Sequence, residues 1–352
     1  MKKMKKLLCA GLSLIMIAQL AACGGGNGTN NKNNQSSGSN TNSPSSSSAV
    51  VIKLSLSQAV TEPTVIAANA FKEEVEEKSG GSIEVQVYPD NQIGNERDAV
   101  EGMTLHTVQM VAPANAVITN FIPEFNIFSL PMIFRDKQHI YDVLDNVGMD
   151  EYYQNLCEQS GFKLLGWFDL GSRNIMTVSK PINSIDDIKG LKIRNQESTV
   201  EMDGMASFGA SPTSMSYNEL YTALSSSVID GAEAANTNYY AKAFYEVAPN
   251  WAIVGWLECV NPVLMDLTFW NNLSAEQQAV LEEACQNMVD LERQLYAQSE
   301  DDALAELEKM DGVNITYPDR APFEAAAKTC YDQYADQLGG MDKIQAIIDY
   351  GK

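Results

Sequence analysis

The stretch from 185 to 194 reads IDDIKGLKIR, and it decides the fold. A charged turn that contains Gly190 is followed by a short apolar strand, and Arg194 stands at the end of that strand. Ligands of α/β domains bind at the carboxyl ends of strands, and a guanidinium makes bidentate, charge-assisted contacts with a carboxylate. Because no catalytic motif accompanies this arrangement, the stretch predicts an α/β protein that holds an anion without transforming it.

Strand and helix signals alternate on both sides of this stretch, and this order predicts a parallel sheet with right-handed crossovers. The predicted strands are 50–56, 83–88, 108–112, 162–170, 175–178, 191–193, 228–230, 262–269 and 313–317, with a turn at 171–173. The predicted helices are 63–79, 94–105, 139–144, 149–160, 199–208, 217–224, 322–337 and 341–350.

One further helical pattern is unusually long. It begins at Ser274, with Gln277 at the capping-box position, and continues to Met310, about twice or more the usual helix length. A helix of this length can reach from one domain to another. The sequence therefore predicts two domains, formed by 49–170 plus 260–299 and by 171–259 plus 300–352.

The N-terminus carries an export signal. Lysines precede an apolar run of 16 residues, 7–22, which is short for a membrane span and typical of a signal peptide. The run ends in LAAC, which resembles the lipobox of bacterial lipoproteins, so we expect a signal peptide at 1–22 and a lipid on Cys23. A general signal peptide with a chance cysteine is the alternative. Residues 23–48 are almost wholly small and polar and predict a disordered tether on the outer face of the cytoplasmic membrane.

Charge and motifs exclude several functions. The formal charge of −22 argues against nucleic acid, whose phosphates require Lys and Arg. The two histidines, His106 and His139, lie in no metal-binding or catalytic pattern, and nucleotide-binding glycine motifs are absent, so no metal, cofactor or catalytic residue is expected. Paired carboxylates stay open in a chain with 46 acidic residues, which leaves a surface-attached carbohydrate hydrolase as an alternative.

Beyond the export signal the chain has four cysteines, Cys157, Cys259, Cys285 and Cys330. An even number in an exported protein permits disulfides. Cys285 falls on the apolar face of a helix, which favours buried free thiols.

Arginines are scarce, and two of them follow glycine-bearing turns at strand ends. Arg173 follows the turn at 171–172, and Arg194 follows the strand at 191–193. On residue type alone, a structural ion pair with one of the many acidic residues is the simpler interpretation for each.

A series of motifs gives these arginines a more specific context. In order they are GNE at 94–96, LPMIF at 130–134, GSR at 171–173, DDIKGLKIR at 186–194, FGASP at 208–212, ELYTAL at 219–224, VIDGAE at 228–233 and YEV at 245–247. From 51 to about 339 the chain resembles the substrate-binding proteins of tripartite ATP-independent periplasmic (TRAP) transporters, the family of the C4-dicarboxylate binder. The resemblance implies a type II periplasmic-binding-protein-like fold with hinge strands and a domain-spanning helix. It also implies closure on an organic or sugar acid and delivery to an ion-gradient-driven permease.

The resemblance also implies roles for individual residues. By position, Arg194 corresponds to the arginine that binds the ligand carboxylate, and Arg173 to a supporting arginine. Glu96 lies where hydroxyl-bearing ligands are contacted in sugar-acid binders. Trp167 and Asp169 lie near the predicted hinge and are candidates for the cleft lining, with core packing or ion pairing as the alternative.

One position departs from the family pattern. Ala234 stands where the family commonly has an asparagine that contacts the ligand. We expect Asn236 or Asn238 to supply this contact, and we expect more apolar room in the cleft. A binding protein of an ATP-driven (ABC) importer is the remaining alternative.

Overall fold

The computed structural model describes residues 49–145 and 151–352. The predicted signal peptide, the predicted lipidation site Cys23 and the predicted tether at 23–48 lie outside these residues. The strands are β1 (Val50–Ser55), β2 (Ile83–Tyr88), β3 (Met110–Val111), β4 (Phe162–Thr177), β5 (Lys192–Asn195), β6 (Ser211–Ser214), β7 (Gly231–Ala234), β8 (Asn250–Asp266) and β9 (Asn314–Thr316). The α-helices are α1 (Pro63–Lys78), α2 (Glu96–Thr104), α3 (Asn115–Ile118), α4 (Lys137–Val143), α5 (Glu151–Gln159), α6 (Thr199–Ser207), α7 (Leu220–Ser225), α8 (Asn236–Ala241), α9 (Leu267–Asn271), α10 (Ala275–Leu307), α11 (Ala321–Tyr334) and α12 (Met341–Asp349). Short 3₁₀ helices include η1 (Pro123–Ser129), η3 (Ile185–Ile188), η4 (Tyr217–Glu219) and η5 (Phe244–Glu246).

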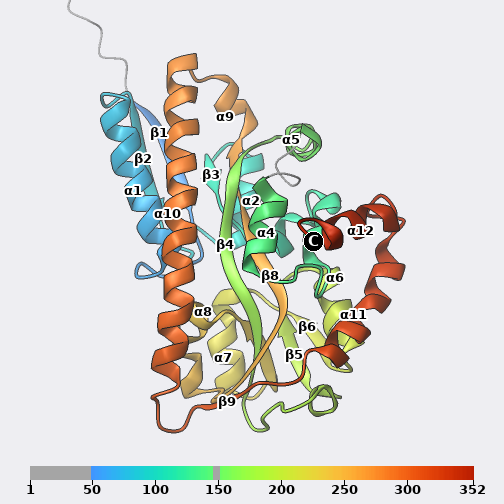
Figure 1. The fold of residues 1–352 in the computed structure, drawn as a ribbon. Coiled ribbons are helices and arrows are strands. Elements are labelled where there is room, and N and C mark those ends of the chain that lie inside the picture. The colour runs from blue at the N-terminus through green and yellow to red at the C-terminus, as the bar shows by residue number, and fades with distance from the viewer. Residues whose placement is uncertain (1–48, 146–150) are drawn as a thin grey trace, which may run out of the picture. The chain divides into compact units, whose positions relative to one another are not determined.

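The strands form one mixed sheet in the order β2-β1-β3-β8-β4-β7-β5-β6, and β9 pairs with β8. The pairs at the two ends, β1 with β2 and β3 and β5 with β6 and β7, are parallel, as the alternating pattern predicts. The centre differs, because the long strands β4 and β8 run antiparallel to each other. Figure 1 shows these two strands running side by side and joining the two parallel parts of the sheet.

Strand β4 is continuous where the sequence predicted two strands and a turn. Gly171 has a φ of +76°, and the register with β8 shifts between Asp169 and Ser172. The glycine therefore forms a β-bulge, which inserts an extra residue and bends the strand without ending it. In β8, Gly255 has a φ of +58° and lies where the register shifts again, and this strand begins at Asn250 rather than at the predicted position 262.

Helix α10 confirms the long helical pattern. Its 33 residues begin after Ser274, whose side chain accepts a hydrogen bond from the Gln277 N–H, and the Gln277 side chain accepts one from the Ser274 N–H. The helix contacts α1 near its start, then β4, and then α8. It thus links the parallel units at both ends of the sheet (Figure 1).

The C-terminal helices pack differently from the predicted domain division, which assigned 300–352 to the second domain. Tyr331, Ile344 and Ile347 lie in the same buried apolar cluster as Phe125 and Phe162, which belong to the predicted first domain. The end of α11 and the helix α12 therefore cover the first part of the chain, whereas the start of α11 packs in an apolar cluster of the predicted second domain. The remaining boundaries of the two domains stay a prediction.

Two further features bear on the expectations from the sequence. The four cysteines, Cys157, Cys259, Cys285 and Cys330, are buried and free, as the apolar setting of Cys285 indicated. Within the described ranges, no helix is both long and apolar enough to cross a membrane.

Candidate ligand-binding site

Arg194 lies near the end of β5 with its side chain almost wholly buried. Its Nη1 donates to Oε1 of Glu233 at 3.0 Å, and its Nε donates to the carbonyl oxygen of Met215 at 2.9 Å. Glu233 stands on the neighbouring strand β7, which is parallel to β5. Among the described residues the Nη2 of Arg194 has no hydrogen-bond partner, so it is free to donate to a ligand.

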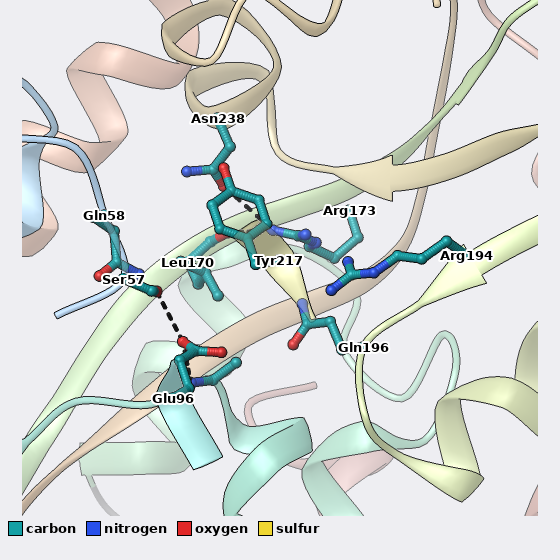
Figure 2. A pocket seen from close by; sticks show the side chains of 10 residues that line it. Ser57, Gln58, Glu96, Leu170, Arg173, Arg194, Gln196, Tyr217 and Asn238 are labelled. Carbon is teal, nitrogen blue, oxygen red and sulfur yellow. Dashed lines mark hydrogen bonds between the residues drawn. The ribbon is translucent and has the colours of Figure 1, made fainter. Parts of the chain in front are cut away.

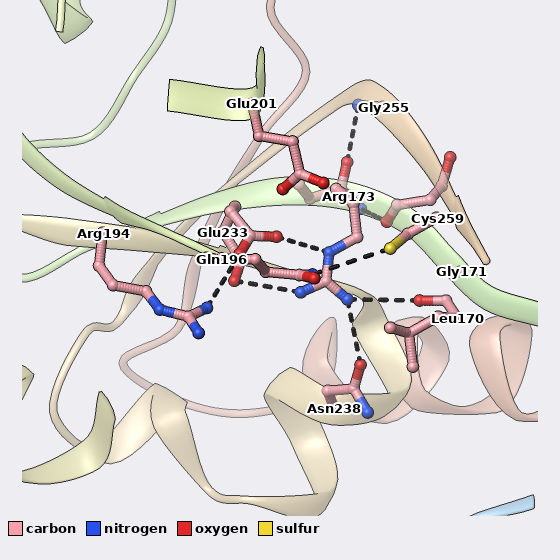
Figure 3. Close-up of polar contacts among 12 residues, drawn as sticks. Leu170, Gly171, Arg173, Arg194, Gln196, Glu201, Glu233, Asn238, Gly255 and Cys259 are labelled. Atoms are coloured by element: carbon pink, nitrogen blue, oxygen red, sulfur yellow. Dashed lines mark hydrogen bonds and ion pairs between the residues drawn. The ribbon is translucent and has the colours of Figure 1, made fainter. Parts of the chain in front are cut away.

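Arg173 is held more completely. From β4 its Nε donates to Oε2 of Glu233 at 2.6 Å, and Nη2 approaches the carbonyl oxygen of the same residue at 3.4 Å. Its Nη1 approaches the carbonyl oxygen of Leu170 at 3.3 Å and Oδ1 of Asn238 at 3.4 Å. Glu233 therefore bridges both arginines with its two carboxylate oxygens, as Figure 3 shows. The predicted ion pairs do form, and they orient the guanidinium groups.

One carboxylate between two buried arginines leaves an excess positive charge. Burial lowers the pKa of Arg194, and the Glu233 carboxylate opposes this only in part. For Arg173 burial acts in the same direction, but Glu233 outweighs it and the pKa lies above its ordinary value. Arg194 is therefore the less fully neutralised cation, and an anion beside it would replace the missing negative charge.

Both arginines line a cavity with about 320 Å³ of empty space, including its opening to solvent. Its walls come from the loop after β1, the start of α2, the strands β4 and β5 and the segments η4 and α8, as Figure 2 shows. The lining residues are Ser57, Gln58, Glu96, Ala114, Leu170, Arg173, Arg194, Gln196, Tyr217 and Asn238. Segments far apart in the sequence thus meet at one site.

Glu96 supplies a negative group to this cavity, as the resemblance implies. It is the first residue of α2, which Asn95 and Asp98 cap through a capping box. Its Oε1 accepts hydrogen bonds from the Ser57 hydroxyl at 2.9 Å and from the Ala114 N–H at 3.1 Å. Both bonds use the same oxygen, so Oε2 stays available. Burial raises the pKa of Glu96, and these two hydrogen bonds act against that rise.

Three buried polar atoms at the cavity have no hydrogen-bond partner among the described residues. They are Oε1 of Gln58, Oε1 of Gln196 and the hydroxyl of Tyr217. A buried polar group without a partner is costly, and a ligand with hydroxyl groups would supply one. Sequence reasoning missed all three residues. For Gln196 a signal existed, because it follows Arg194 by two positions and so continues the same face of the strand.

Two candidates from the sequence lie elsewhere. Trp167 is fully buried and packs against Phe125 and Phe128, with ring centroids 5.2 and 5.3 Å apart, so it belongs to the core. Asp169 accepts a hydrogen bond from the Gly171 N–H at 2.7 Å and pairs with Lys137 at 3.4 Å, so it stabilises the bulge in β4. Neither residue lines the cavity, and in both cases the alternative interpretation holds.

Of the two candidate asparagines, one lines the cavity and the other does not. The Asn236 Oδ1 accepts from the Trp251 indole at 3.0 Å, and Asn236 does not line the cavity. Asn238 does line it, and its Oδ1 accepts from the Tyr296 hydroxyl at 3.2 Å. The expectation that Ala234 widens the cleft is wrong. Side chains alternate along β7, so Glu233 points towards the arginines and Ala234 lies in an apolar cluster on the other face.

The site therefore combines a cation at one wall with carbonyl and carboxylate acceptors at another. In 49–145 and 151–352 there is no group of three or more His, Cys, Asp or Glu residues placed to hold a metal ion. The arrangement suits the recognition of a small acid through hydrogen bonds and charge.

Comparison with known proteins shows which family this chain matches. Residues 54–337 match the family model described as bacterial extracellular solute-binding protein, family 7 (DctP). The chain is 32% identical over 273 residues to the uncharacterized protein YiiZ of Salmonella typhimurium, a match that covers 77% of this chain and 83% of that protein.

Two solved structures extend the comparison. A TRAP periplasmic solute-binding protein of Bradyrhizobium sp. in complex with galacturonate has a TM-score of 0.80 and 31% identity, over 85% of this chain and 99% of that chain. One of Sulfurospirillum deleyianum with bound succinate has a TM-score of 0.81 and 27% identity, over 86% and 100% of the two chains. These relatives are binding proteins rather than enzymes, which contradicts the alternative of a surface-attached carbohydrate hydrolase. The family match, over most of the chain, shows that this protein belongs to the DctP family of TRAP solute-binding proteins, with their two-domain α/β fold.

Proposed function

We propose that this protein captures a sugar acid of hexuronate size outside the cytoplasm and delivers it to the membrane subunits of a TRAP permease. The observation that carries the proposal is the shared carboxylate of Glu233, which fixes Arg194 in the cavity while leaving Nη2 without a partner. We assign the ligand carboxylate to Arg194. Arg173 supports Arg194 indirectly, because it donates a hydrogen bond to Glu233. Asn238 in turn accepts a hydrogen bond from Arg173.

The opposite wall favours hydroxyl groups on the ligand. Glu96 offers a carboxylate oxygen, and Gln58 and Gln196 offer carbonyl oxygens that lack donors. Hydroxyl groups would donate to all of these. A second carboxylate would bring no donor and would meet the charge of Glu96. A hexuronate therefore fits better than a C4-dicarboxylate such as succinate, although relatives with either kind of ligand exist.

Attachment to the membrane completes the proposal. We propose that Cys23 carries the lipid and that residues 23–48 tether the protein near its permease. A variant with Cys23→Ser should pass from the membrane fraction to the soluble fraction of the producing cells. Unchanged membrane association would contradict the anchor and would leave the binding proposal untouched.

A thermal-shift screen with galacturonate, glucuronate, succinate and glucose tests the binding proposal. A ligand that binds the folded state raises its stability by RT ln(1 + [L]/Kd). We expect the two uronates to raise the melting temperature, succinate to raise it less and glucose to leave it unchanged. A shift with glucose alone would contradict the proposal, and a shift with succinate alone would contradict the assignment of Glu96.

A further inference from the structure

A second, more open groove adjoins the ligand cavity. It contains about 600 Å³ of empty space, including its opening to solvent. Its lining residues are Ser57, Asp90, Asn91, Tyr217, Asn218, Tyr221, Lys242 and Phe244. Ser57 and Tyr217 line the ligand cavity as well, so the two spaces adjoin each other.

The groove combines aromatic rings with polar groups. The ring centroid of Phe244 lies 6.0 Å from that of Tyr217 and 6.5 Å from that of Tyr221. Tyr221 is 38% exposed, whereas Phe244 is buried. The C–H face of a pyranose packs on such a ring while its hydroxyl groups bond to polar neighbours. Asn91 and Asn218 supply those neighbours.

Tyr217 stands at the junction of the two spaces. Tyr217 lines the ligand cavity together with Asn238 and Arg173, as Figure 2 shows. Its hydroxyl is buried and, within the described ranges, has no hydrogen-bond partner. A ligand that passes from one space into the other would carry a hydroxyl or a bridging oxygen past this group.

Lys242 gives the groove a cation of its own. Its Nζ pairs with Asp90 at 2.7 Å, and the two side chains are 25% and 42% exposed. Ion pairs with this exposure contribute little to stability, so Lys242 can turn towards a ligand at small cost. A second acidic group would then find a partner here.

We propose that this groove is a second sugar subsite and that the protein binds an acidic disaccharide. One uronate unit is held by Arg194, and the second packs on Tyr221 with its carboxylate near Lys242. The proposal rests on the proposed function for its first unit and adds the groove as the site of the second.

Calorimetric titration with galacturonate and with α-1,4-linked digalacturonate tests it. We expect the disaccharide to bind the unchanged protein about 10-fold or more tightly than the monosaccharide, because the added unit gains ring and charge contacts. Tyr221→Ala should weaken binding of the disaccharide about 5- to 10-fold and leave the monosaccharide unchanged. Tyr221→Phe keeps the ring and should retain the disaccharide affinity.

Tyr240→Ala is the matched control, since Tyr240 is 37% exposed and lines neither space. It should bind both sugars as the unchanged protein does. If the protein binds galacturonate but not digalacturonate, the groove is only a solvent-filled entrance. This result would contradict the second subsite and leave the proposed function unchanged. Equal disaccharide affinity in Tyr221→Ala would overturn the second subsite too. If neither sugar binds, both the hexuronate assignment and the second subsite are contradicted.

Discussion

At the scale of single residues, Glu233 connects the two arginines of the site. It is fully buried, and both of its oxygens accept from a guanidinium group. Removing one member of a buried charge cluster leaves the others without compensation. The geometry of Arg194 therefore depends on a residue that does not itself line the cavity.

Glu233→Gln should lower the free energy of unfolding by about 3 kcal/mol, because two buried cations lose their shared anion. A bound uronate replaces part of that charge, so the ligand should raise the free energy of unfolding more in this variant than in the unchanged protein. Urea unfolding with and without galacturonate measures both effects. Glu101→Gln, at an exposed position of α2, is the control and should change neither. Equal stability of the two variants would contradict the bridging role.

The stability of the protein should depend on pH through Glu201, a buried residue of α6. Burial raises its pKa from 4.5 to about 8, and the nearby Glu233 charge adds to this rise. The folded state therefore keeps a proton that the unfolded state releases. The contribution to stability is complete below pH 4.5 and is lost as the pH rises from there to about 8.

Glu201→Gln should remove this loss. Its stability should match that of the unchanged protein near pH 5 and exceed it at pH 8, by at most about 1.4 kcal/mol for each pH unit crossed. Urea unfolding at pH 5, 6.5 and 8 measures the difference. A difference that does not grow with pH would argue against a protonated Glu201.

At the scale of elements, the long strands β4 and β8 explain which parts of the fold the sequence could predict. Most strands and helices of the parallel units are confirmed to within a few residues, because their apolar periodicity is local. The sequence did not predict β6 or α8, and the strand predicted at 228–230 lies instead at 231–234, in β7. The continuity of β4 was missed because glycine favours turns and bulges alike, and only pairing with β8 decides between them.

The site residues were likewise predictable only where a local sequence motif marks them. Arg194 and Glu96 were found from motifs, whereas Gln58 and Tyr217 become visible only when loops from distant segments meet. The expectation for Ala234 came from the family pattern, which compares residue types and does not show where a side chain points. In β7 Ala234 lies in an apolar cluster, on the face opposite Glu233.

Gly171→Ala tests the bulge. An added Cβ would lie 2.6 Å from the Cβ of Ala235, and the φ of +76° is unfavourable for alanine. We expect a loss of about 2–3 kcal/mol in unfolding free energy from strain and overpacking together. Gly161→Ala is the matched control, since its φ is +85° with nothing within 4 Å of the added atom. It should lose about 1 kcal/mol. Equal losses would mean that close packing at Gly171 contributes nothing.

At the scale of the whole molecule, polar contacts join segments on the two sides of the cavity. Arg97 of α2 pairs with Glu197 at 2.8 Å, and the Asn120 side chain donates to the Glu197 carbonyl oxygen at 2.8 Å. Glu197 lies two residues after the end of β5, so these contacts hold the wall that carries Glu96 against the wall that carries Arg194. They stabilise the arrangement that encloses a ligand.

Glu197→Gln should therefore weaken ligand binding about 2- to 5-fold, as expected for a partly exposed ion pair. The effect should shrink as salt rises, because screening already weakens the pair in the unchanged protein. Calorimetric titration at low and high salt measures it, with Glu101→Gln as control. An undiminished effect at high salt would point to a direct ligand contact.

The central claim is that Arg194 binds the carboxylate of the ligand, and a cycle that changes both partners tests it most directly. Galacturonate and its methyl ester are titrated into the unchanged protein and into Arg194→Ala. The unchanged protein should bind the acid about 100-fold or more tightly than the ester, because the ester lacks the charge. In Arg194→Ala the two affinities should become nearly equal. An undiminished preference for the acid in that variant would contradict the claim.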